Sequence, residues 1–159
     1  MITGLKPKGF TWVITDHLAV SERIGGNGFQ HRRVRRDEEI DWIVHEAGVT
    51  EVVSLLAGNQ NLSSYVAAGL NVHHVPVVGE VSVETQSELY ETLSSLYPAT
   101  DAVVLVHREM IDDVVAGLLG GYIVYAGLVE NRVLALAVIQ EIVGRALGPE
   151  GRSLVHSEE

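Results

Sequence analysis

The chain has 159 residues, of which 47% are hydrophobic and 20% charged, and its formal charge at pH 7 is −10. This length suffices for one sizeable core and is too short for two ordinary domains. The acidic balance disfavours general binding to nucleic acid or to anionic lipid. The absence of any cysteine excludes disulfides, thiolate metal sites and a cysteine nucleophile.

The sequence shows neither a signal peptide nor a membrane helix. No apolar core follows the lysines of the first ten residues. The longest apolar stretch, 114–129, is shorter than the roughly 20 residues that a membrane helix needs. We therefore expect a cytoplasmic protein in which this stretch is a buried helix. Its four glycines would permit close packing, or would form an assembly face if the helix were partly exposed.

Short β-rich runs alternate with amphipathic stretches, which predicts an α/β fold: a single domain with a largely parallel sheet flanked by helices. In chain order, we expect strands at 12–15, 18–20, 51–57, 72–77 and 102–107, and helices at 37–47, 62–68, 84–97, 114–129 and 131–146. The glycines at 25, 26 and 28 lack the Lys-Ser/Thr pair of a phosphate loop and indicate a turn. The predicted boundaries are an extension at 1–10, a domain at 11–154 and a tail at 155–159.

Seven segments together resemble one family in their order and spacing. They are 12–16 (WVITD), 18–21 (LAVS), 48–56 (GVTEVVSLL), 69–76 (GLNVHHVP), 103–107 (VVLVH), 135–141 (ALAVIQE) and 148–151 (GPEG). Over roughly residues 11–154 the chain resembles the cysteine-dependent dual-specificity and protein-tyrosine phosphatases. The resemblance implies a phosphate-binding loop that begins with a His-Cys pair at a strand end and closes with an arginine.

At the positions of that loop, this chain has other residues. The segment is His107, Arg108, Glu109, Met110, Ile111, Asp112, Asp113 and Val114. Arg108 occupies the nucleophile's position, and Val114 has no donors with which to hold phosphoryl oxygens as the closing arginine does. The family's general-acid aspartate corresponds to about Gly79, beside Glu80. The resemblance therefore implies a degenerate member with no catalytic residues.

We hypothesise that the protein is a pseudophosphatase that acts as a binding or regulatory module. It would need no cofactor and no metal. Its partner would be a protein, acidic or phosphorylated, or else a small anion; nucleic acid and membranes are not expected. A subunit that assembles with an active relative would have the same sequence features, and the oligomeric state is left open.

The alternative hypothesis is a phosphoesterase or other hydrolase with a non-cysteine, metal-assisted mechanism. His73, His74 and His107 lie near predicted strand ends, and loop carboxylates follow His107. Histidines and carboxylates are metal ligands. Adjacent residues of a strand point to opposite faces, so at most one of His73 and His74 can share a site with His107.

The loop residues also have structural interpretations. The resemblance implies that His107 braces the loop through hydrogen bonds to backbone. Asp112 and Asp113 precede the apolar helix, where carboxylates cap free amides. Arg108 either pairs with a nearby carboxylate and fills the former phosphate site, or points outward and receives an anionic ligand.

The segment from His31 to Arg36 contains four of the eleven basic residues: Arg32, Arg33, Arg35 and Arg36. The acidic residues that follow it favour local salt bridges on a solvated face. The alternative is that these arginines recruit an acidic or phosphorylated partner or a nucleotide. Together with Arg108, they are the candidate binding residues.

Overall fold

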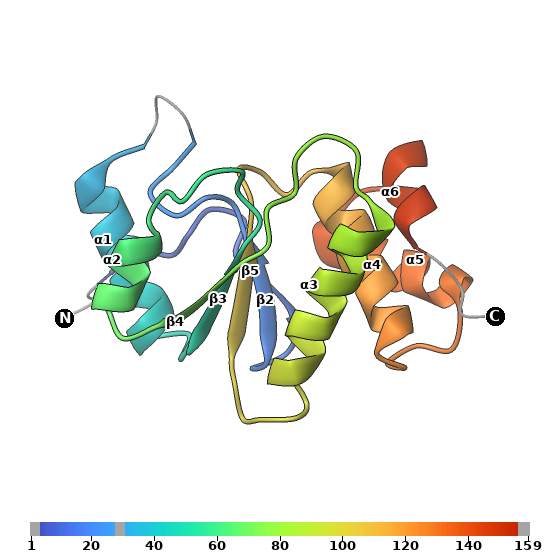
Figure 1. The fold of residues 1–159 in the computed structure, drawn as a ribbon, viewed down its shortest axis with the longest axis horizontal. Helices are drawn as coiled ribbons and strands as arrows, with labels where there is room; N and C mark the ends of the chain where they lie inside the picture. The colour runs from blue at the N-terminus through green and yellow to red at the C-terminus, as the bar shows by residue number, and fades with distance from the viewer. Residues whose placement is uncertain (1–3, 28–30, 156–159) are drawn as a thin grey trace. The chain divides into compact units, whose positions relative to one another are not determined.

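The computed structural model describes residues 4–27 and 31–155. The chain divides into two compact units, Met1–Met110 and Ile111–Glu159. The first unit contains the whole sheet and three helices, and the second contains three helices (Figure 1).

A five-stranded sheet in the order β1-β2-β5-β3-β4 forms the centre of the first unit. Its strands are β1 (Thr11–Ile14), β2 (Leu18–Ser21), β3 (Glu51–Ser54), β4 (Asn71–His74) and β5 (Val104–His107). All neighbouring pairs are parallel except β1 with β2. The structure therefore confirms the predicted α/β fold and the largely parallel sheet, although each strand is only four residues long.

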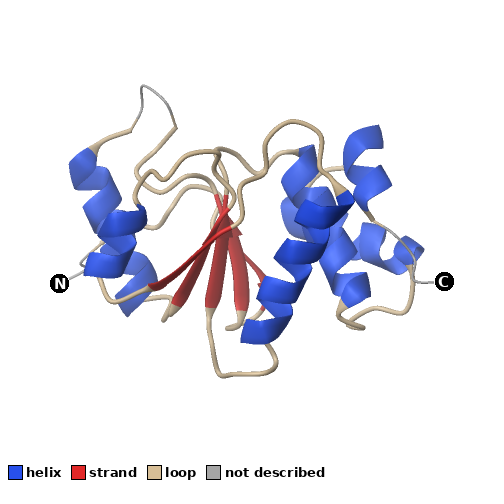
Figure 2. Ribbon diagram, in the orientation of Figure 1, coloured by secondary structure: helices blue, strands red, loops and turns tan. Residues whose placement is uncertain are grey.

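Helices cover both faces of this sheet, as predicted. Figure 2 shows α1 (Arg33–His45) and α2 (Leu62–Ala67) on one side and α3 (Val83–Leu96) on the other. Side chains alternate between the faces of a strand. The aligned Ala19, Leu105 and Val52 accordingly belong to the same core cluster as residues of α1 and α2. Full burial of a large aliphatic side chain contributes about 1.5–3 kcal/mol.

The start of α1 differs from the prediction. Because Asp37 and the acidic residues after it suit a helix N-terminus, we expected the helix to begin there, but it begins at Arg33. Basic residues in the first turn oppose the helix dipole, and two ion pairs compensate. Arg35 pairs with Glu39, and Arg36 pairs with Asp37.

Residues 4–10 of the predicted N-terminal extension pack within the first unit. The amide of Leu5 donates to the carbonyl of Glu38 at 3.1 Å, and Phe10 is buried in the same cluster as Ile40 and Ile43. The predicted glycine-rich turn is seen at Gly25 and Gly26, both with positive φ, whereas Gly28 lies outside the described residues.

The second unit consists of α4 (Asp113–Tyr125), α5 (Arg132–Val143) and α6 (Pro149–Leu154). Helix α4 packs against both α5 and α6. The prediction ended the helical region at 146 and missed α6, although Pro149 at its first turn is a typical helix-start signal. As expected, Val114 to Val124 of α4 are buried. Across residues 4–27 and 31–155, no helix has both the length and the apolarity to cross a membrane.

The close packing of α4 on α6 depends on Gly117. A Cβ atom at this position would lie 2.4 Å from the carbonyl oxygen of Gly151 and 2.7 Å from its Cα. At Gly120 the nearest atoms are side-chain carbons of Val155 and Ile139, at 3.0 Å and 3.2 Å. The backbone of Gly151 cannot move aside as readily as the side chains of Val155 and Ile139 can. We therefore expect a Cβ atom to be tolerated at Gly120 and not at Gly117.

We predict that Gly117→Ala destabilises the protein by about 1–3 kcal/mol, the usual cost of forcing extra atoms into a packed core. Gly120→Ala is the matched control, since its side-chain neighbours can shift and alanine favours the helix by up to about 1 kcal/mol. Urea unfolding of both variants measures the difference. Equal stability of the two variants would contradict the role given to Gly117.

Candidate functional site: the carboxyl ends of the parallel strands

Four polar side chains occupy the last positions of the four parallel strands. Ser21, His107, Ser54 and His74 are aligned in register across β2, β5, β3 and β4. The first three are completely buried. In open α/β sheets, ligands bind outside the carboxyl ends of the strands. This edge is therefore where the fold itself places a candidate site.

His107 is held from inside the protein. Its Nε2 lies 3.2 Å from the hydroxyl of Tyr65 on α2, and both side chains are buried. Within the described chain its Nδ1 has no hydrogen-bond partner, so the predicted bracing of the loop backbone by this ring is wrong. Because β5 is central, the ring points into the core and meets α2. Burial, with smaller contributions from the charges of Arg23 and His74, lowers the pKa of His107 to about 3.

A hollow of about 240 Å³ lies beside these strand ends. It is lined by Leu56, Ala57, Gly58, Gln60, Val77, Val78, Gly79, Arg108 and Glu109. The structure thus brings together Arg108 and Gly79, to which the sequence resemblance assigned the nucleophile's and general acid's positions. Glu80 is exposed and is absent from this lining.

Arg108 is half-buried in this lining, and its Nη2 donates to the carbonyl oxygen of Val77 at 3.1 Å. The hollow is present beside the guanidinium, so Arg108 lines this space without filling it. Glu109 pairs with Arg23 at 3.4 Å, and the amide of Arg23 donates to the carbonyl of Glu109. The negative charge that follows Arg108 is therefore partly offset by Arg23.

The segment from His107 to Val114 passes from the first unit into the second after Met110. In the second unit, Asp112 is the N-cap of α4 and accepts from the amide of Val115 at 3.0 Å, as predicted. Asp113 has a different role. It accepts from the amides of Gly148 and Gly151 at 2.7 Å and 2.6 Å, which ties the start of α4 to α6.

Each of the three candidate histidines has its own partner. His74 Nε2 lies 2.8 Å from the carbonyl of Leu56, whereas His73 Nε2 lies 3.3 Å from Glu51. The register puts His74, and not His73, on the face of His107. In the part of the chain that the structure describes, no three or more His, Asp or Glu side chains gather in a way that could hold a metal ion.

The arginine-rich segment is separate from the hollow. Arg35 Nε donates to the buried carboxylate of Glu39, whose other oxygen accepts from the amide of Gly25. Arg36 pairs with Asp37, while Arg32 and Arg33 are exposed. None of these four arginines belongs to the described lining of the hollow. Their role as binding residues stays a prediction.

Comparisons with solved structures identify proteins that have a similar fold. No protein-family model matches the chain, and no curated protein does. Kinase-associated phosphatase, with its catalytic cysteine changed to serine, matches with a TM-score of 0.72 and 15% identity over 95% of this chain and 93% of that one. The catalytic core of the S. cerevisiae PP-IP phosphatase Siw14, in complex with citrate, matches with a TM-score of 0.68 and 14% identity over 96% of this chain and 87% of that one. Human DUSP28 matches with a TM-score of 0.66 and 16% identity over 95% of this chain and 92% of that one.

At sequence identities this low, similarity to a solved structure shows a shared fold and nothing about activity. The chain has the fold of dual-specificity and protein-tyrosine phosphatases across nearly its whole length. This confirms the fold that the sequence resemblance implied.

Sequence reasoning missed two residues that shape this edge. Tyr65 is buried against His107, and Arg23 pairs with Glu109, but both contacts join segments more than 40 positions apart. A signal for Tyr65 was present, because it is the only aromatic residue of the short 62–68 stretch. Nothing in the sequence marked Arg23.

We predict that His107 makes the stability pH-dependent. Its pKa in the folded protein, about 3, lies below the ordinary value of 6.5. Protons therefore bind the unfolded chain preferentially between these values. The neutral ring makes its full contribution to the free energy of unfolding above pH 6.5. This contribution falls with decreasing pH, by up to about 1.4 kcal/mol per pH unit.

Urea unfolding from pH 7 to pH 5 tests this prediction. The variant His107→Gln does not titrate in this range, and we expect a shallower loss of stability with falling pH than in the unmodified chain. His45→Gln is the control, because the His45 side chain is 66% exposed and its removal should leave the slope nearly unchanged. Identical slopes for the chain and for His107→Gln would refute the prediction.

Proposed function

We propose that this protein is a phosphatase-like binding module, a pseudophosphatase, that recognises an acidic or phosphorylated segment of a partner protein at the hollow beside Arg108. The observation that carries the proposal is the position of Arg108 at the exit of the central strand, where its guanidinium reaches the Val77 carbonyl. A cysteine phosphatase needs a thiolate there, and the chain has no cysteine.

The surroundings of Arg108 support binding over phosphoryl transfer. Val114, at the position of the family's closing arginine, is a buried residue of α4 and has no donor for transition-state charge. Glu80 is exposed and outside the lining of the hollow. Because His73, His74 and His107 bond to separate groups, the metal-assisted alternative has less support than binding.

The chemistry of the hollow suggests its ligand. Arg108 supplies one cation, and the carboxylate of Glu109 is partly offset by Arg23. Exposed apolar side chains lie in the same loops: Val78 in the lining and Met110 after Glu109 are 66% and 59% exposed. An anionic side chain flanked by apolar residues matches this combination of charge and surface.

The first experiment is a thermal-shift and calorimetric screen with inorganic phosphate, vanadate, and peptides that contain phosphotyrosine, phosphoserine or glutamate. A ligand that binds only the folded state raises the melting temperature. We expect binding of at least one of these anions, with about a tenfold weaker affinity in Arg108→Ala, equivalent to 1.4 kcal/mol. Lys8→Ala is the control, because it removes one exposed cation that is not in the lining of the hollow.

One further variant defines the outcome. In the double variant Arg32→Ala/Arg33→Ala, which leaves the internal ion pairs of α1 intact, we expect unchanged affinity. Loss of affinity in that variant, with none in Arg108→Ala, would move the site to the arginine-rich segment and overturn the proposal. Absence of binding by every anion would also overturn it.

An activity assay tests the other half of the proposal. We expect no turnover of p-nitrophenyl phosphate with or without Mg²⁺, Mn²⁺ or Zn²⁺. Restoring two family residues in Arg108→Cys/Val114→Arg should recover little activity, since the general acid is still missing. Metal-dependent turnover by the unmodified chain would favour the hydrolase hypothesis instead.

A further inference from the structure

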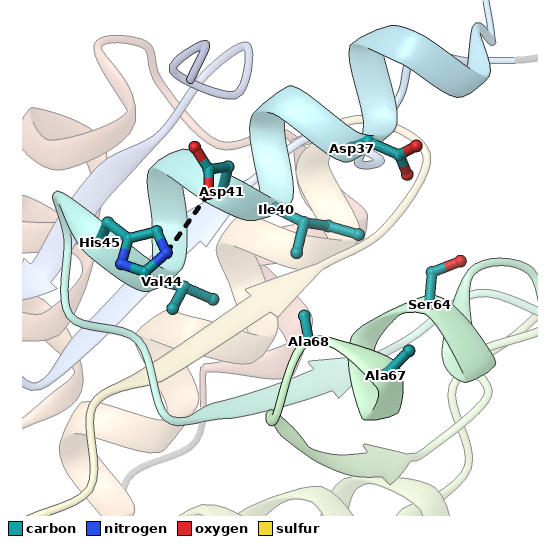
Figure 3. A pocket seen from close by; sticks show the side chains of 8 residues that line it. All are labelled: Asp37, Ile40, Asp41, Val44, His45, Ser64, Ala67 and Ala68. Atoms are coloured by element: carbon teal, nitrogen blue, oxygen red, sulfur yellow. Dashed lines mark ion pairs between the residues drawn. The ribbon is translucent and has the colours of Figure 1, made fainter. Parts of the chain in front are cut away.

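A second depression lies between α1 and α2. Its volume is about 360 Å³. Helix α1 contributes Asp37, Ile40, Asp41, Val44 and His45, and α2 with its C-cap contributes Ser64, Ala67 and Ala68 (Figure 3). We call this depression the α1–α2 groove. It shares no lining residue with the hollow beside Arg108.

The floor of the α1–α2 groove is apolar. Ile40 and Val44 are one turn apart on α1, and Figure 3 shows both side chains directed into the space above α2. Across from them, Ala67 and Ala68 are exposed and too small to close this space. Ile40 is only 6% exposed and closes the base of the groove, so the apolar surface open to a partner is that of Val44, Ala67 and Ala68. An apolar strip with a polar rim is typical of a protein interaction site.

The rim of the groove is acidic. The side chains of Asp37 and Asp41 are 60% and 42% exposed and lie one turn apart, about 6 Å along the helix axis. Two like charges at this spacing destabilise a helix unless cations lie near them. Lysines or arginines four residues apart in a helical partner have the same 6 Å spacing.

Partners within the chain do not saturate these carboxylates. Arg36 contacts Oδ1 of Asp37 at 3.0 Å, and His45 contacts Oδ1 of Asp41 at 3.3 Å. A carboxylate has two oxygens and about four acceptor positions, so each can accept a further donor. Arg36 is permanently charged, whereas His45 carries a charge only when protonated. Asp41 is therefore the stronger anchor for an incoming cation.

We propose that the α1–α2 groove docks an amphipathic helix of a partner protein, with aliphatic side chains over Val44 and Ala67 and a lysine or arginine on Asp41. Charge complementarity selects this occupant: the rim is acidic, and the chain's formal charge of −10 attracts a basic segment. Laying an apolar helix face into a groove is a recurring mode of peptide recognition.

The test uses a fluorescein-labelled 18-residue Leu/Lys peptide with helical periodicity, and its binding is measured by fluorescence anisotropy and by ¹H–¹⁵N NMR of the protein. One comparison peptide has Glu in place of each Lys. The other has the same Leu/Lys composition in an order without helical periodicity. We expect the periodic Lys peptide alone to shift amides of α1 and α2. We expect its affinity to fall about tenfold, equivalent to 1.4 kcal/mol, in Asp41→Asn and in Ala67→Leu.

Matched controls separate the groove from general attraction to an acidic protein. Glu38→Gln removes the same charge from the same helix at an exposed position outside the groove, and Val66→Leu adds bulk at an exposed neighbour of Ala67. Both should change affinity less than twofold. Equal binding of the aperiodic peptide, or unchanged affinity in Ala67→Leu, would overturn the proposal. So would shifts of α1 and α2 that depend on protein concentration alone, because a second copy would then occupy the groove.

Discussion

Parallel pairing of β5 on both of its edges is the constraint on which the candidate site depends. Hydrogen bonds to β2 and β3 leave Val104 to His107 buried and align the last residue of each strand in one row. Since the carboxyl ends of parallel strands meet at one edge, the segments that follow β3, β4 and β5 gather there. The same burial leaves His107 with one neutral partner, Tyr65, and makes its protonation unfavourable.

The chemistry at this edge depends on far fewer residues than the fold does. A fold can be retained while the residues of its site change, because core packing and site chemistry use different side chains. Here the core cluster contains Ile43, Val52 and Leu105, whereas Arg108 and Gly79 lie in loops beyond the strands. A guanidinium at Arg108 carries a positive charge and donates hydrogen bonds.

The first unit presents two surfaces of opposite electrostatic preference. The hollow beside Arg108 suits an anion, while the carboxylates of Asp37 and Asp41 suit a cation. The two surfaces share no lining residue: residues of α1 and α2 form one, and the segments after β3, β4 and β5 form the other.

The sequence by itself determined the α/β class, the largely parallel sheet, the approximate elements and the identity of the residues from His107 to Val114. These follow from local periodicity and from residue identity, which need no knowledge of distant contacts. Only the tertiary structure decided that Arg108 reaches Val77, that Tyr65 meets His107, and that the arginines near His31 lie outside the hollow. It also corrected the start of α1 to Arg33, where Arg35 and Arg36 pair with Glu39 and Asp37. Such contacts join side chains whose relative positions are set by packing, and local sequence patterns do not encode them.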